Sequence, residues 1–179
     1  PPLRRRLPFE LIGGWEIGLL AFMVLLYAAG VVINPKFFGQ PDAFSAILRD
    51  TARFGVMAAG MTFVIVNKDL DLSVGSTFGL VATIFSIAFS KSYYDLGIVA
   101  SLSAAVLTGL AVGLVNGVFV TVLRVPAFIT TLTMLFIGRG LVLGLTGGKT
   151  ISYSEKAASD GAWFFQIGET NAFGFNNQI

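Results

Sequence analysis

The chain has 179 residues, of which 55% are hydrophobic and only 12% are charged, and its formal net charge is +2. A soluble domain carries about 25% charged residues, so a soluble fold of this length cannot hide so much apolar surface. There is no cysteine and no histidine, which excludes disulfide frameworks, thiolate metal sites and serine–histidine hydrolases.

The first predicted element is an apolar run, Ile17–Ile33, that follows the basic cluster Arg4–Arg6. The run is longer than the hydrophobic part of a usual signal peptide and has no small-residue cleavage site before Asn34. We therefore interpret residues 15–34 as a first membrane span that stops at a proline. The basic cluster places residues 1–14 in the cytoplasm, because positive residues near span ends favour that side.

Further apolar segments predict an all-α, multi-pass transmembrane helical bundle with about five spans. A spanning helix needs about 20 mostly apolar residues. An amphipathic lead-in at residues 41–53 is expected to lie in the membrane interface before the second span. From a cytoplasmic start, five spans make residues 15–145 the membrane domain and leave 146–179 as an extracytoplasmic polar segment, which we expect to be truncated. The later spans are predicted at residues 51–67, 73–90, 97–123 and 126–145.

Glycines recur at four-residue spacing in three of these spans. Small residues let helix backbones approach closely where lipid gives no hydrophobic drive for association. The spacing favours helix packing within one subunit, and a contact between two subunits is the alternative. The glycines are Gly75 and Gly79, then Gly109, Gly113 and Gly117, then Gly140, Gly144 and Gly148.

Asp69, Asp71 and Ser73 lie in a polar break between two apolar runs. Ionised side chains are costly in lipid, so this turn lies at a membrane surface or lines a protected cavity. One interpretation is helix capping, in which side-chain oxygens accept free amide hydrogens. The other is a coupling or gating role near the cytoplasmic mouth. No further ligands lie nearby, so no metal site is expected.

Polar residues inside the last two spans are candidates for a substrate path. Asn116 either makes a hydrogen bond between helices or lines a pore. Thr130 and Thr131 either bond back to their own helix or line the path. Arg139 cannot lose its charge, so it acts as a structural clamp or belongs to the path.

Two sequence blocks carry a resemblance to a known family. Ala59–Val66 followed by Asp69–Ser76 resembles the membrane-spanning permease of bacterial ABC importers for simple sugars, the ribose, xylose, arabinose and galactose group. That family typically shows a glycine-methionine-threonine helix and then a D-L-S-V-G-S turn. Order and spacing agree across about residues 40–155. The second block consists of Val125–Leu132, Gly138–Leu141 and Thr146–Gly148.

The chain departs from the family pattern in two respects. The first departure is Asp69, where the family often has glycine, so we expect this acidic residue to be a feature of a subgroup. Permeases for branched-chain amino acids and nucleosides share the architecture but usually lack the D-L-S-V-G-S run. The second departure is length. Family members have about ten spans of about 20 residues each, so the chain is similar to the N-terminal half only.

The resemblance implies a permease subunit of an ATP-binding-cassette importer that passes a monosaccharide across the bacterial inner membrane. Separate cytosolic ATPase subunits would bind the ATP, so the permease itself would need no cofactor and would not be an enzyme. Its other partners would be a periplasmic sugar-binding protein, a second permease subunit in a homo- or heterodimer, and membrane lipid. No nucleic-acid partner is expected.

Two alternatives from other classes remain open. An ion-coupled secondary transporter would use Asp69 or Asp71 to bind the coupling ion. In a non-transport membrane assembly subunit, the polar residues would only satisfy one another. The dependence of uptake on an ATPase partner, or on an ion gradient, distinguishes these classes.

Overall fold

The computed structural model describes residues 14–152 and 162–164, which form helices and turns with no strand among them. The predicted all-α fold is confirmed. The basic cluster of the predicted cytoplasmic segment 1–14 and most of the predicted segment 146–179 lie outside the described residues. The chain divides into two compact units, one ending at Arg53 and the other beginning at Phe54.

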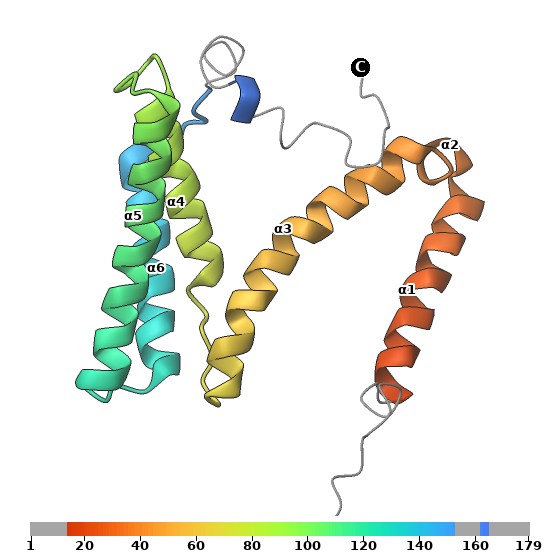
Figure 1. Ribbon diagram of the computed structural model, residues 1–179, viewed down its shortest axis with the longest axis horizontal. Coiled ribbons are helices and arrows are strands. Elements are labelled where there is room, and N and C mark those ends of the chain that lie inside the picture. Colours follow the sequence, from red (N-terminus) through yellow and green to blue (C-terminus); the bar gives the residue numbers. More distant parts are fainter. Residues whose placement is uncertain (1–13, 153–161, 165–179) are drawn as a thin grey trace, which may run out of the picture. The chain divides into compact units, whose positions relative to one another are not determined.

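The first unit contains two helices and the start of a third (Figure 1). Helix α1 (Gly14–Ile33) is the predicted first span, and it ends where Pro35 cannot supply a backbone N–H to continue it. Helix α2 (Pro35–Phe38) is a single turn. Helix α3 (Pro41–Val66) then runs continuously for 26 residues into the second unit.

Tyr27 holds the turn after α1 in place. Its hydroxyl donates a hydrogen bond to the Phe38 carbonyl oxygen at 2.9 Å. Its ring packs edge-on against Phe38 and Phe44, with ring centroids 6.3 and 5.9 Å apart. Such edge-to-face pairs are favourable beyond the area they bury. The aromatic cluster therefore fixes α2 against α1.

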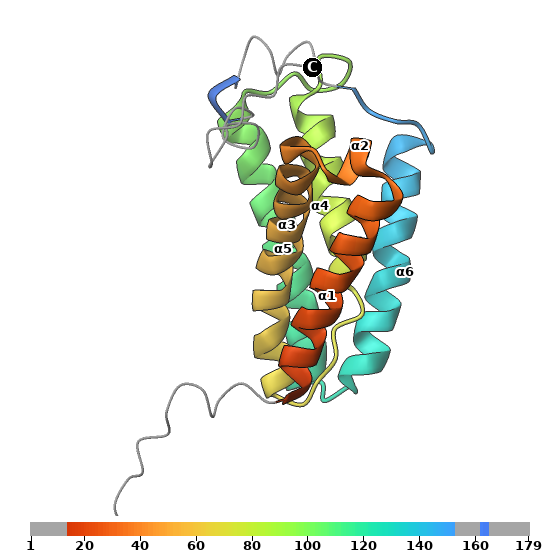
Figure 2. The same cartoon turned by 90° about the vertical axis from the view of Figure 1, so that its right-hand side faces the viewer.

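The second unit is a helix bundle with α4 packed against both α5 and α6 (Figures 1 and 2). Helix α5 continues directly into a π-helical segment, η2, whose hydrogen bonds span five residues instead of four. A short turn that contains Pro126 then leads into α6. The bounds are α4 Val74–Phe89, α5 Ile98–Gly117, η2 Val118–Val122 and α6 Ala127–Thr146.

Three helices of the described chain are long and apolar enough to cross a membrane: Trp15–Ile33, Ile98–Val122 and Ala127–Thr146. Helix α4 is apolar but shorter, with 16 residues. The expected interfacial lead-in is not a separate element, because residues 41–53 form one helix with the predicted second span. The prediction of about five spans stays a prediction for α3 and α4.

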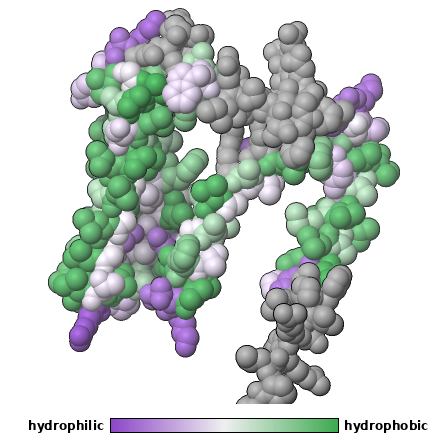
Figure 3. Space-filling view, viewed as in Figure 1, coloured by the Kyte–Doolittle hydropathy of each residue, from purple (hydrophilic) through white to green (hydrophobic). Residues whose placement is uncertain are grey.

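The interior of the second unit is small and mixes polar side chains with apolar ones such as Leu80, Ile87 and Phe89, while most of its large apolar side chains face outward. Phe78 is 54% exposed and Leu114 is 70% exposed, whereas Ser101 is fully buried. Figure 3 shows hydrophobic residues along the bundle and hydrophilic residues at its ends. This arrangement suits lipid, which solvates apolar side chains and leaves close packing and hydrogen bonds to hold helices together. The buried polar residues include Ser73, Ser76, Ser90, Ser101, Asn116, Thr130 and Thr131.

Two glycines of the second unit pack closely against a neighbouring helix. A Cβ at Gly138 of α6 would lie 3.0 Å from Ser76 Oγ, and one at Gly109 of α5 would lie 3.5 Å from Val81 Cγ2. The other spaced glycines meet no neighbouring helix among the described residues, so the choice between packing within one subunit and a contact between two subunits stays open for them. An added Cβ would meet nothing within 4 Å at Gly75, Gly79, Gly113, Gly117, Gly140, Gly144 or Gly148.

Candidate functional site

The turn between α3 and α4 begins with a compact helix end. Lys68 has a φ of 63°. Its N–H donates to the Ile65 carbonyl at 2.8 Å, and the Asp69 N–H donates to the Val64 carbonyl at 3.2 Å. These are the two hydrogen bonds of a Schellman motif, which satisfies the last carbonyls of a helix. The chain therefore leaves α3 abruptly and presents Asp71 beside the start of α4.

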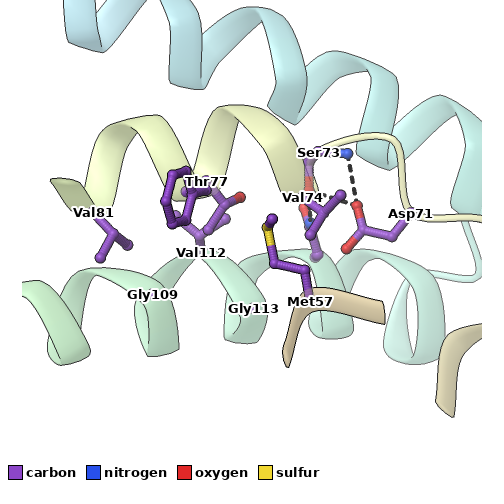
Figure 4. A pocket seen from close by; sticks show the side chains of 11 residues that line it. Met57, Asp71, Ser73, Val74, Thr77, Val81, Gly109, Val112 and Gly113 are labelled. Carbon is purple, nitrogen blue, oxygen red and sulfur yellow. Dashed lines mark hydrogen bonds between the residues drawn. The ribbon is translucent and has the colours of Figure 1, made fainter. Parts of the chain in front are cut away.

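Asp71, Ser73 and Asn116 are joined by hydrogen bonds. Asp71 Oδ1 accepts the Ser73 backbone N–H at 2.7 Å and the Ser73 hydroxyl at 2.6 Å (Figure 4). The Ser73 oxygen accepts a hydrogen bond from Asn116 Nδ2 at 2.9 Å. Ser73 is 1% exposed and Asn116 is 8% exposed. We call this arrangement the Asp71–Ser73–Asn116 chain, and it links the turn to the middle of the bundle through α5.

The expected capping role of Ser73 is wrong for its side chain. Ser73 occupies the N-cap position of α4, but its side chain accepts no capping hydrogen bond from the helix. The Ser73 hydroxyl instead donates to the Asp71 carboxylate, in a charge-assisted hydrogen bond that is stronger than a neutral one. Asp71 is the residue that accepts a backbone amide here. Asp69 is exposed and lies in the helix-ending turn.

The threonines of α6 differ in their hydrogen-bond partners. Thr131 Oγ1 donates to the Leu70 carbonyl at 3.2 Å, so α6 also holds the α3–α4 turn. Thr133 bonds back to the Ile129 carbonyl of its own helix at 2.8 Å, as expected for a helical threonine. Thr130 Oγ1 is buried and has no hydrogen-bond partner in the described part of the chain.

Arg139 is not brought to this turn. It is exposed on α6, and no ion pair joins it to another described residue. The clamp interpretation therefore has no partner within residues 14–152. Arg139 also does not line the pocket that adjoins Asp71.

A pocket of about 270 Å³ lies against the turn, between α4, α5 and the part of α3 after Phe54. Its polar lining residues are Asp71, Ser73, Thr77 and Asn116, and the rest of the lining is apolar side chains and glycine. Figure 4 shows Asp71 and Ser73 together at one end. The sequence motifs did not predict these wall residues, and the spacing of Gly109 and Gly113 indicated helix packing rather than a pocket. The apolar wall residues include Met57, Val74, Phe78, Val81 and Val112.

The site offers hydrogen-bond acceptors but no metal cluster. Asn116 Oδ1 is buried and receives no hydrogen bond from any described residue. Within residues 14–152 and 162–164, no three histidine, cysteine, aspartate or glutamate side chains gather to hold a metal ion.

Residues 43–178 match the family model described as "Branched-chain amino acid transport system / permease component". The chain belongs to this permease family. The matched residues include the whole α3–α4 turn and the pocket, so the predicted resemblance to an importer permease is confirmed at the family level. Members are permease components of transport systems, so at this level the chain is a non-enzymatic membrane protein.

The chain is also similar to proteins named "Autoinducer 2 import system permease protein LsrC". It is 38% identical over 133 residues to the protein of Yersinia pseudotuberculosis serotype O:3 (strain YPIII). The same identity and length are found with that of Yersinia pestis (strain Pestoides F). In both cases the alignment covers 74% of this chain and 36% of the relative's length. No solved structure matches the chain significantly.

Proposed function

We propose that the chain is part of the permease of an ATP-binding-cassette importer that passes a monosaccharide across the bacterial inner membrane. The Asp71–Ser73–Asn116 chain carries this proposal, because it places hydrogen-bonding groups at the end of a pocket inside a membrane bundle. Polar groups inside a membrane span are costly, and their usual role is in a substrate or ion path. Asn116, Thr130, Thr131 and Arg139 are the proposed path residues, with Asp69, Asp71 and Ser73 as the proposed gating turn.

The partners follow from the same proposal. Separate cytosolic ATPase subunits bind ATP, and a periplasmic binding protein delivers the sugar. A second permease subunit, identical or different, completes the membrane path. The permease then alternates between outward-open and inward-open packings, and the partners bias the populations of these two states.

A second candidate solute is autoinducer 2, since the relatives at 38% identity are named for its import. This candidate keeps the same membrane location, the same partners and the same driving force. It differs from the first only in the molecule that the binding protein delivers.

The test is an uptake assay with the complete permease, its ATPase subunits and its binding protein, expressed together in cells that lack other uptake routes. Labelled D-ribose, D-xylose, D-galactose and autoinducer 2 are offered separately. We expect uptake of at least one of the three sugars, and its loss when the ATPase carries an inactivating substitution. Uptake of autoinducer 2 alone would replace the monosaccharide with the second candidate.

The same assay separates the other classes of protein. Uptake that survives ATPase inactivation and stops when the ion gradient is dissipated would identify an ion-coupled transporter. A complex that assembles in the membrane but moves none of the four solutes would identify an assembly subunit. Either result would overturn the proposal.

A further inference from the structure

We propose that the pocket lined by Asp71 and Asn116, here called the Asp71 pocket, recognises adjacent hydroxyl groups of the transported solute. The inference rests on the proposed import of a polyhydroxylated solute. It adds where the permease itself binds that solute and which two side chains read its hydroxyls.

The Ser73 hydroxyl determines the direction of the Asn116 amide. The Ser73 hydroxyl has one proton, which it donates to Asp71 Oδ1 at 2.6 Å. Its oxygen can then only accept from Asn116, so the NH₂ group must face Ser73 and does so at 2.9 Å. Asn116 Oδ1 consequently faces away from Ser73, buried and without a donor. A buried acceptor left without a donor is unfavourable, so this oxygen calls for a hydrogen-bond donor.

The Asp71 carboxylate supplies the other acceptor. Its Oδ1 accepts both hydrogen bonds from Ser73, and its second oxygen accepts none from the described residues. Figure 4 shows this second oxygen on the side of Met57, a wall residue of the pocket. The polar end therefore presents two acceptors, and Thr77, which also lines the pocket, adds a hydroxyl that can donate or accept. Hydroxyl groups satisfy such a pair, whereas an apolar helix cannot, because its backbone N–H groups are already bonded.

The volume and the walls of the pocket indicate what kind of molecule fits it. Sites for drug-sized ligands span about 300–1,000 Å³, so a pocket of about 270 Å³ suits a smaller molecule. Phe78 and Val112 provide apolar surface for the C–H groups of a sugar ring, and Gly109 and Gly113 keep the α5 side free of bulk. A hydrated cation would meet the same two oxygens but gain nothing from these walls.

The experiment measures protection of a cysteine placed in the wall. The chain has no cysteine, and any cysteine elsewhere in the complete permease is replaced by serine. Met57→Cys is then alkylated with N-ethylmaleimide in the assembled importer, with and without D-ribose or a cyclohexanediol whose hydroxyls are adjacent. Cyclohexanol, which has a single hydroxyl on the same ring, is the matched control compound. Lys68→Cys, exposed in the turn and outside the pocket, is the control position.

We expect D-ribose and the adjacent diol to slow alkylation of Met57→Cys about tenfold at about ten times the half-protecting concentration. Alkylation of Lys68→Cys should not change, and cyclohexanol should protect weakly. Asp71→Asn keeps the oxygen that accepts from Ser73 but removes the charge, and Asn116→Leu removes the free oxygen. Each substitution should raise the half-protecting concentration about tenfold, because each weakens or removes one hydrogen bond to the ligand.

Three outcomes would overturn the inference. The first is no protection by either polyhydroxyl compound, and the second is equal protection by cyclohexanol. The third is unchanged protection in both variants while the importer complex remains assembled. Protection by sodium or potassium ions alone would assign the two oxygens to a cation instead. Sugar uptake without protection removes this site but leaves the proposed function standing, and absence of sugar uptake removes the proposed function itself.

Discussion

The Ser73 hydroxyl uses both of its hydrogen-bonding capacities, as a donor to Asp71 and as an acceptor from Asn116. It does so at 1% exposure, so water cannot replace either partner if the hydroxyl is lost. The cost of such a loss is the cost of leaving buried polar groups unsatisfied, which exceeds the net value of the hydrogen bonds themselves.

Ser73→Ala is therefore expected to destabilise the permease by about 1–3 kcal/mol. Ser103→Ala is the matched control, because Ser103 is exposed and bonds only to the Val99 carbonyl of its own helix. Thermal unfolding of the purified complete permease in detergent measures both. Equal melting temperatures for the two variants would contradict the importance assigned to the Ser73 hydroxyl.

A second prediction at this scale concerns the contact between α4 and α6. A Cβ at Gly138 would lie 3.1 Å from Ser76 Cβ, so Gly138→Ala requires Ser76 or its helix to shift slightly. Overpacking of this kind costs about 1–3 kcal/mol. Ser76→Gly removes the opposing atoms, so the double variant should recover part of the lost melting temperature. Strictly additive effects of the two substitutions would show that they do not meet.

Part of the site was predictable from local sequence. Asp71 and Ser73 lie two positions apart, and their polar break between apolar runs marked them directly. Their link to Asn116 spans 43 positions and depends on how α4 packs against α5, which no local pattern encodes. Met57 and Phe78 read as ordinary apolar span residues. Only the arrangement of three helices makes them pocket walls.

At the scale of the elements, α6 is fastened to the α3–α4 turn by Thr131. Its hydroxyl donates to the Leu70 carbonyl, in a segment that is not helical and has no helical partner for that oxygen. Thr133, one half-turn away, bonds only within α6. Two threonines of one helix therefore provide a matched comparison.

Thr131→Val should lower the stability of the permease by about 0.5–1.5 kcal/mol, the net value of a typical hydrogen bond. Thr133→Val should leave it nearly unchanged, because the Ile129 carbonyl keeps its helical hydrogen bond. Melting temperatures of the two variants, measured side by side in the same detergent, test this. A larger effect at Thr133 would mean that the Thr131 bond does not hold the turn.

Helix positions were predicted well where the segment is mostly apolar along its whole length. The span predicted at 126–145 is α6, Ala127–Thr146, and the span at 97–123 is α5 with η2. Residues 41–53, predicted as an interfacial lead-in, are helical and continuous with the second span, so no boundary separates the two, and their place at the membrane interface stays a prediction. The end of α3 at Val66 agrees with the predicted end of the span at 67, because the polar break marks it, although Lys68, and not glycine, adopts the left-handed conformation that ends the helix.

At the scale of the whole molecule, the helices of the second unit run so that their connections alternate between two ends. The α3–α4 turn and the start of α6 meet at one end through Thr131 and Leu70. At the other end, the Ser90 hydroxyl donates to the Ser152 carbonyl at 2.9 Å. The connections at one end of the bundle should therefore lie on the opposite side of the membrane from the connections at the other end.

Side-specific thiol labelling tests this arrangement. Lys68→Cys and Arg124→Cys should react with a membrane-impermeant maleimide only from the cytoplasmic side. Lys91→Cys and Lys149→Cys should react only from the opposite side. The expectation follows from an N-terminus placed inside by its arginines. Labelling of Lys68→Cys and Arg124→Cys from different sides would show that α4 and α5 do not both cross the bilayer.

The π-helical segment after α5 has a consequence for the spacing of the chain. The Leu123 N–H reaches back five residues to the Val118 carbonyl at 3.1 Å, so this turn holds one residue more than an α-helical turn. Deleting one residue among Val118–Val122 would convert the segment to α-helix without breaking the backbone ladder. Everything beyond it would then rotate about the helix axis. The surplus residue thus sets the angular offset between the glycine-bearing face of α5 and the tight connection at Arg124.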